Sequence, residues 1–476
     1  MVDTKIRDLR GASRRRFMKW MGAVGAAFAV DRSCLLNFSS DVGGEAFAGG
    51  MACASTNRSV HIVGGNGSLA WFQLLWPFVE IAQANNPSFA WHAPGEGQLH
   101  VGGDKPFYYG PEAPWLEGGQ PKARRAVTAM MSGANETHTQ TPVTSAVVAP
   151  NASLVATSAA IQRAVPTLLP VIGVGPVNLG AAPGAPSAAN VPSAGGMVDL
   201  FNSAASQLIL SSQEDRELYE TYYKAVVGLR EGAKLPTWKR HLDVTKTAAN
   251  VVGRNLGGQL TPTNADLAMY GVPTLLASQA SAPAKTKLEN LARTLITTAK
   301  AFKLNLTMNV QVALAPGASD GTFSDPHAAF DNMNALRATI TALGTMLNAF
   351  YDDLASSPDP ACSESSLADT VILTAHGDTP KTPTQASAWP DSTPGNANWV
   401  YVMSNGYLKS GWFGDIKAND ATSGWDLATG ADVPGKPAAE TATAAGAAIA
   451  YAVAKGDMYP VKDFYAGPDI DGVLKS

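Results

Sequence analysis

Ser59-Val-His-Ile-Val-Gly-Gly65 runs directly into Asn66-Gly67-Ser68, and the fold class follows from this segment. Its first residues are mostly apolar and β-branched, which predicts a short buried strand, and its glycines predict a tight turn. Residues 69–84 then repeat their apolar side chains at helical spacing. A strand, a glycine turn and a helix in this order are typical of the opening of a parallel α/β sheet.

Strands and helices continue to alternate along the rest of the chain. We predict strands at 126–131, 304–315, 369–375 and 399–404, and helices at 284–303, 328–354 and 438–455. Residues 172–198 are rich in glycine, proline and alanine and predict an exposed connection. The pattern predicts an α/β fold with a mostly parallel sheet sandwiched by helices and with long loop insertions. Functional groups in such a sheet are expected beyond the carboxyl ends of the strands.

The N-terminus has the features of an export signal. Ser13-Arg-Arg-Arg-Phe-Met-Lys19 resembles a twin-arginine motif, and a short apolar segment follows it over residues 20–30. That segment is too short to cross a membrane as a helix, which takes about 20 apolar residues. Small residues predict cleavage near residue 29 or near residue 48. We therefore expect residues 1–48 to be a signal and extension, and residues 49–476 to form one periplasmic or secreted domain that the twin-arginine translocase exports.

Charge argues against a nucleic-acid partner. The full chain has a formal net charge of −4, while residues 1–19 carry seven Lys or Arg and two Asp. Removing residues 1–29, with their net +5, leaves −9, and cleavage near residue 48 leaves −7. A protein that neutralises phosphates needs clustered Lys and Arg. No such cluster follows the signal, and no later segment resembles a transmembrane span.

Two of the three cysteines remain after cleavage near residue 48. These are Cys53 and Cys362. An exported protein meets an oxidising compartment, so a disulfide between them is one interpretation, and two buried thiols are the other.

Polar groups follow the predicted strands at four places far apart in the sequence. Ser68 follows the first strand and His138 the second, Asp325 and His327 follow the third, and His376 and Asp378 the fourth. Imidazole and carboxylate side chains suit a divalent metal such as zinc, manganese or calcium, which lowers the pKa of bound water. We expect Asp325, His327, His376 and Asp378 to hold such a metal, with Ser68 and His138 in catalytic roles.

Each of these residues also has a structural interpretation. Asp325 can cap a helix that starts at Pro326, and His376 and Asp378 can form a polar turn. Other histidines fit structural or surface positions better, namely His61, His92, His100 and His241. The glycine turn at 64–67 does not match a dinucleotide-binding fingerprint.

The order of these landmarks resembles a family of bacterial twin-arginine-exported proteins that is placed in the alkaline phosphatase and sulfatase superfamily. The resemblance covers most of the chain and is strongest over residues 305–416, including Asp325-Pro-His327 and the strand before His376. It implies an alkaline-phosphatase-like fold and a metal-dependent ester hydrolase. The chain departs from the family at Asn66, at 375–379 and at 395–398, and it lacks the cysteine motif of formylglycine sulfatases.

Two functions fit these observations. One is an exported metal-dependent hydrolase of a phosphate or related ester, with a small-molecule, glycan or lipid ester as its substrate. The other is a non-catalytic relative that binds an envelope partner through loops rich in glycine and aromatic residues, where several tryptophans lie (Trp71, Trp76, Trp91, Trp115 and Trp389). Fold similarity alone does not choose between them.

Overall fold

The structure is a computed structural model. It describes residues 53–64, 75–76, 98–100, 103–105, 107–109, 116–117, 120–121, 126–134, 146–176, 178–201, 225, 228–229, 232, 234–235, 238, 242–243, 256–279, 282–314, 333–377, 397–416 and 421–475. The chain divides into two compact units. One comprises 1–50, 166–168 and 195–261, and the other comprises 51–165, 169–194 and 262–476. The sheet and the candidate site belong to the second unit.

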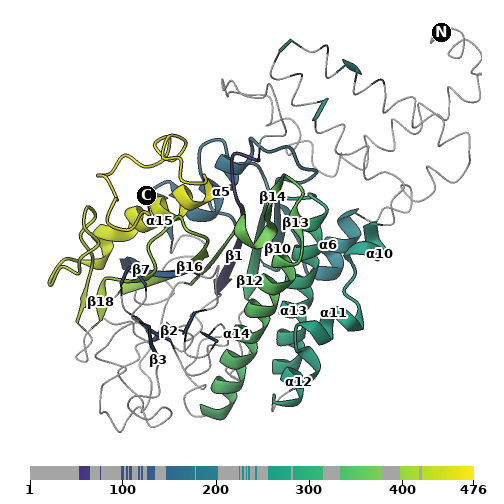
Figure 1. Ribbon diagram of the computed structural model, residues 1–476, viewed down its shortest axis with the longest axis horizontal. Helices are drawn as coiled ribbons and strands as arrows, with labels where there is room; N and C mark the ends of the chain where they lie inside the picture. The colour runs from purple at the N-terminus through teal and green to yellow at the C-terminus, as the bar shows by residue number, and fades with distance from the viewer. Residues whose placement is uncertain are drawn as a thin grey trace, which may run out of the picture. The chain divides into compact units, whose positions relative to one another are not determined.

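An eight-stranded sheet forms the centre of the second unit (Figure 1). Its order is β11 (Ala189–Val191), β10 (Val171–Val174), β12 (Asn309–Leu314), β1 (Arg58–Gly64), β15 (Val371–His376), β16 (Ala397–Ser404), β7 (Ala126–Ala134) and β17 (Gly411–Phe413). Only β16 runs against the other seven, because it pairs antiparallel with both β15 and β7. The prediction of an α/β fold around a mostly parallel sheet is therefore confirmed.

The predicted strands reappear with small shifts of their ends, and β1 and β15 are buried along their whole length. Two predictions need correction. Residues 172–198 are an exposed connection only in part, because they begin in the fully buried β10 beside β12 and include β11, while most described residues between these strands are exposed or half-buried. Within the helix predicted over 69–84, residues 75–76 form β2 (Leu75–Trp76), which pairs with β4 (Phe107–Tyr109), and the rest of that range lies outside the described residues. Pairing with a neighbouring strand, which no local pattern records, decides the structure of short apolar runs such as these.

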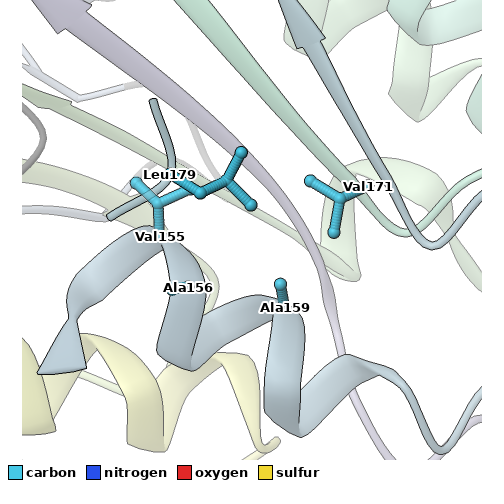
Figure 2. Packing of buried hydrophobic residues seen from close by; sticks show 5 residues of the cluster. All are labelled: Val155, Ala156, Ala159, Val171 and Leu179. Atoms are coloured by element: carbon cyan, nitrogen blue, oxygen red, sulfur yellow. The ribbon is translucent and has the colours of Figure 1, made fainter. Parts of the chain in front are cut away.

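The helix α5 (Leu154–Gln162) covers one face of the sheet. Ser153 caps it by accepting a hydrogen bond from the Ala156 N–H, and every residue of the helix is buried. Its apolar residues join Val171 and Leu179 in a small core cluster (Figure 2). Gln162 at its last turn bonds Ser59, so α5 lies on the face of β1 that carries Ser59.

The helix α13 (Ala282–Lys303) lies on the opposite face. Neighbouring residues of a strand point to opposite faces, so Arg58 points away from the side that Ser59 occupies. The Arg58 guanidinium stacks over the ring of Phe302, which belongs to α13, at 5.9 Å from the ring centre. Helices therefore cover both faces of the sheet, as predicted, and α14 (Met333–Ala355) packs against α13.

The remaining elements surround this sheet or belong to the other unit. The helices are α6 (Ala194–Phe201), α10 (Leu256–Leu260), α11 (Asn264–Met269), α12 (Val272–Ala277), α15 (Ala442–Val453) and the 3-10 turns η6 (Leu367–Asp369) and η8 (Ala438–Thr441). The short strands are β2 (Leu75–Trp76), β3 (Gln98–His100), β4 (Phe107–Tyr109), β5 (Leu116–Glu117), β6 (Gln120–Pro121), β8 (Val147–Ala149), β9 (Ala152–Ser153), β13 (Pro358–Asp359), β14 (Cys362–Ser366), β18 (Asp415–Ile416) and β19 (Thr422–Ser423). Within the described ranges, no helix combines the length and the apolar character that a membrane span requires.

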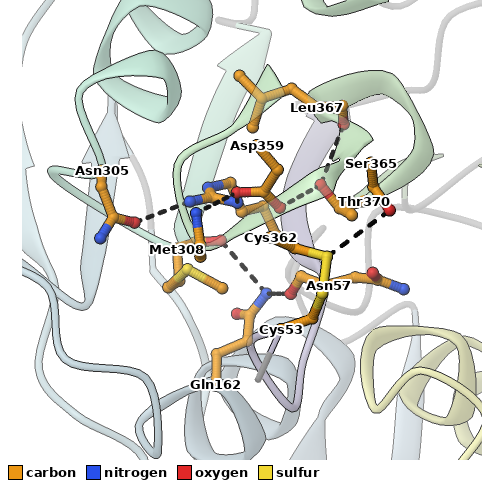
Figure 3. A network of polar contacts seen from close by, with 12 residues as sticks. Cys53, Asn57, Gln162, Asn305, Met308, Asp359, Cys362, Ser365, Leu367 and Thr370 are labelled. Atoms are coloured by element: carbon orange, nitrogen blue, oxygen red, sulfur yellow. Dashed lines mark hydrogen bonds and ion pairs between the residues drawn. A yellow bond between two sulfur atoms is a disulfide. The ribbon is translucent and has the colours of Figure 1, made fainter. Parts of the chain in front are cut away.

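A disulfide joins Cys53 to Cys362, so of the two interpretations of these cysteines the bond is the one found (Figure 3). It connects the segment before β1 to the start of β14. The Ala54 N–H donates to the Ala361 carbonyl at 2.9 Å beside it. The first described residues are thereby fastened to a hairpin more than 300 positions later in the chain.

Candidate functional site at the carboxyl edge of the sheet

The carboxyl ends of the central strands meet at one edge of the sheet. β1, β12 and β15 are parallel and adjacent, and they end at Gly64, Leu314 and His376. β7 ends at the same edge, because its Ala134 pairs with Ala397, the first residue of the antiparallel β16. This edge is where a doubly wound sheet gathers its functional groups.

Most of the predicted site residues lie outside the described residues. These are Ser68, His138, Asp325, His327 and Asp378. In the sequence they follow β1, β7, β12 and β15, so the strands that precede them do end at one edge, as predicted. The roles of these five residues stay predictions.

His376 is the predicted site residue that the structure describes. It is the last residue of β15, and only 2% of its surface is exposed. Neither ring nitrogen has a hydrogen-bond partner among the described residues. Burial lowers the pKa of His376 to about 4, so the imidazole is neutral near pH 7. A buried polar group without a partner costs free energy, so this position calls for an explanation.

His61 lies on the same face of the sheet, one strand away. Its register partner on β15 is Thr374, and that of His376 on β1 is Val63, so the two histidines are diagonal neighbours. The Nδ1 atom of His61 lies 2.8 Å from the Thr374 hydroxyl, while its Nε2 has no partner among the described residues. Burial, and then the nearby His376, lowers the pKa of His61 to about 3.

Sequence reasoning assigned His61 to a structural or surface role and did not connect it with His376. A signal was present, because period-2 alternation places His61 on the face of β1 that carries Ser59. The strand register, which puts Thr374 and His376 on the same face, is visible only in the folded sheet.

Farther from the carboxyl edge, the same face carries a connected polar network. Gln162 donates to the Ser59 hydroxyl at 3.0 Å and to the carbonyl oxygens of Asn57 and Met308. It also accepts from the Asn309 side chain at 2.9 Å. One glutamine from α5 therefore ties the polar groups of β1 and β12 together, and Figure 3 shows its bonds to Asn57 and Met308.

Buried polar atoms without a described partner occur along this face, from the Asn309 Oδ1 within the network to the carboxyl edge. Gln311, the register partner of His61 on β12, has a buried Oε1 without a partner in the described part of the chain. The same holds for the Oδ1 of Asn398 at the start of β16. Together with the Nε2 atom of His61 and both ring nitrogens of His376, these atoms make a set of buried polar atoms without a partner in the described part of the chain. Such a set is where an ordered water, an ion or a ligand is expected.

The described residues fit part of a metal site. In a neutral imidazole, the ring nitrogen that carries no proton has a lone pair that can bind zinc and similar metals. No group of three or more His, Cys, Asp or Glu that could hold a metal comes together within the described ranges. This part of the chain therefore supplies imidazole donors and not a complete ligand set.

Comparison with known proteins gives no match, because no family model, no curated protein and no solved structure is significantly similar to this chain. The function is therefore inferred from the residues and their geometry.

Proposed function

We propose that this protein is an exported metal-dependent hydrolase of a phosphate or related ester, with an alkaline-phosphatase-like fold. The observation that carries the proposal is the buried, neutral His376, which has no partner among the described residues and lies where β1, β12 and β15 end. An imidazole in this state at this edge suits a metal ligand better than a core residue, because a core histidine normally has both nitrogens bonded.

The arrangement of the sheet supports the fold half of the proposal. Seven strands share one direction, and the single antiparallel strand, β16, begins at the edge where the others end. Four predicted polar segments follow strands at this edge in the sequence. The disulfide supports the compartment, since stable disulfides belong to oxidising environments outside the cytoplasm.

A divalent metal at this edge would polarise the ester and lower the pKa of a bound water. His376 would hold it through one ring nitrogen, together with the predicted ligands Asp325, His327 and Asp378. The burial of His376 excludes bulk water from this ligand and strengthens its interaction with a cation.

The test is the metal content of the exported, mature protein, measured by inductively coupled plasma mass spectrometry. Chromogenic phosphate monoesters, phosphate diesters and sulfate esters then serve as substrates. We expect bound zinc, manganese or calcium in the wild type, hydrolysis of at least one ester class, and loss of both in His376→Asn. His241→Asn serves as the control, because it removes a histidine outside the predicted site.

A folded wild type without metal and without esterase activity overturns this proposal. It favours the alternative function, a non-catalytic protein that binds an envelope partner. A metal-bound but inactive wild type would also contradict the hydrolase, while leaving a metal site to explain.

A further inference from the structure

We propose that His61 is a second imidazole ligand of the metal that His376 binds, so that the site extends inward from the carboxyl edge along β1 and β15. This inference rests on the proposed function for the presence of a metal. It adds a ligand that lies inside a strand, where sequence reasoning had placed a structural histidine. The chemical class is a borderline divalent cation of the zinc type, because the donors are imidazole nitrogens.

The hydrogen bond of His61 favours this role. A metal-binding histidine normally uses its second ring nitrogen to donate a hydrogen bond that fixes the tautomer and the orientation of the ring. The Nδ1 atom of His61 is 2.8 Å from the Thr374 hydroxyl. When Nδ1–H donates to that oxygen, Nε2 carries a bare lone pair. Nε2 is buried and has no partner in the described part of the chain.

The register of the strands brings the two imidazoles to the same place. His61 pairs with Thr374, and His376 lies two residues farther along β15 on the same face. Diagonal neighbours on adjacent strands have their Cα atoms roughly 7–8 Å apart. Two histidine side chains can reach a shared ion across this distance. Gln311 flanks His61 on the other side and adds an oxygen donor, its Oε1, which also lacks a described partner.

Ser59 provides a comparison for His61 on the same strand. Both residues belong to β1, both point to the α5 face, and both are fully buried. Ser59 is bonded to Gln162 within a connected polar network, whereas the His61 Nε2 has no partner in the described part of the chain. An unpartnered buried nitrogen costs free energy, and a bound ion would remove that cost.

Two variants of His61 separate the role of each ring nitrogen. His61→Asn keeps a polar atom near the position of Nδ1, next to Thr374, and removes Nε2. His61→Gln places a polar atom near Nε2 and removes the group at Nδ1. We expect zinc affinity, measured by competition with a chromophoric chelator, to fall at least about 100-fold in His61→Asn. Replacing a residue that only hydrogen-bonds a metal ligand lowers affinity by up to about 100-fold, and loss of a ligand should cost at least as much.

Ser59→Ala is the matched control, since it truncates a buried polar residue of the same strand and face without touching the imidazoles. Its zinc affinity should stay within about threefold of the wild type, while Thr374→Val should lower affinity roughly 10- to 100-fold by releasing the ring orientation. Near-ultraviolet circular dichroism and thermal unfolding verify that each variant is folded.

A measurement on the wild type needs no variant to fold. In protein labelled with ¹⁵N at histidine, zinc addition should shift ring-nitrogen resonances of His61 and His376 into the range of metal-bound imidazole. Zinc-induced shifts confined to other histidines, or wild-type affinity in His61→Asn, overturn this inference. If His376→Asn loses zinc while His61→Asn keeps it, the hydrolase proposal stands and only the role of His61 fails. A wild type that binds no metal defeats both.

Discussion

The buried ion pair of Arg58 and Asp359 is the most demanding interaction at the scale of single residues. Both side chains are 1% exposed, and the guanidinium lies 2.5 Å from the carboxylate. The carboxylate also accepts hydrogen bonds from the Thr370 hydroxyl and the Ala361 N–H, and Arg58 donates to Asn305 (Figure 3). Burial lowers the pKa of Arg58, and the adjacent carboxylate opposes that shift. A charge in this setting depends on its partner, because water cannot replace it.

Asp359→Asn should therefore destabilise the protein strongly. The substitution keeps the shape of the side chain and leaves the Arg58 charge buried without compensation, which typically costs about 3–5 kcal/mol. The loss is measured as the change in unfolding free energy from guanidinium titration. Glu289→Gln is the control, because it breaks an ion pair with Arg293 on the partly exposed face of α13, and such pairs are worth at most about 0.5 kcal/mol. Equal losses in the two variants would show that the burial of the Arg58 pair carries no energetic weight.

At the scale of elements, α15 packs unusually close to its neighbours. The helix reads Ala-Thr-Ala-Ala-Gly-Ala-Ala-Ile-Ala-Tyr-Ala-Val, and its small residues are nearly all buried. It contacts α5, β7 and β8. At Gly446 the backbone of Val147 in β8 occupies the space where a Cβ would stand. Small side chains therefore set the distance between α15 and β8.

Gly446→Ala tests this packing. In an exposed helix the change would stabilise by up to about 1 kcal/mol, because alanine is the better helix former. Here the added methyl meets the carbonyl of Val147, so we expect a net loss of about 1–3 kcal/mol, as in other overpacked cores. The control is Gly232→Ala, since Gly232 is helical and nothing lies within 4 Å of its added Cβ. The thermal unfolding midpoint should fall in the first variant and stay or rise in the second.

At the scale of the whole molecule, one covalent bond joins distant parts of the chain. The Cys53–Cys362 disulfide spans a sequence separation of 309. It lies next to the Arg58 and Asp359 network, so covalent and polar contacts fasten the same end of β1. Closing so long a loop restricts the unfolded chain considerably.

Removing the disulfide should lower stability without changing the fold. We expect the double variant Cys53→Ala, Cys362→Ala to lose about 2–5 kcal/mol of unfolding free energy. The measurement is denaturant unfolding with and without dithiothreitol. The reductant should lower the midpoint of the wild type and leave that of the double variant unchanged. Titration of free thiols shows whether the reductant has broken the disulfide. If it has and the wild-type midpoint is unchanged, the disulfide does not stabilise the protein as predicted.

The sequence by itself determined the class of the fold and most of its main elements. Long periodic segments such as 284–303 and continuous apolar runs such as 369–375 carry their secondary structure locally, because hydrophobic spacing matches one backbone period. The sequence pattern also placed His376 at the end of a strand. It offered a disulfide as one of two interpretations of the two cysteines that pair.

Only the tertiary structure decided which residues meet. The short run at β10 became an inner strand because β11 and β12 pair with it on either side, although its glycine and proline neighbours had predicted a loop. Gln162 of α5 joined Ser59 to Asn309. His61 came beside Thr374 and His376 through a strand register that joins segments more than 300 residues apart. Spacing along the chain cannot encode such contacts, because they depend on which strands become neighbours and on their alignment.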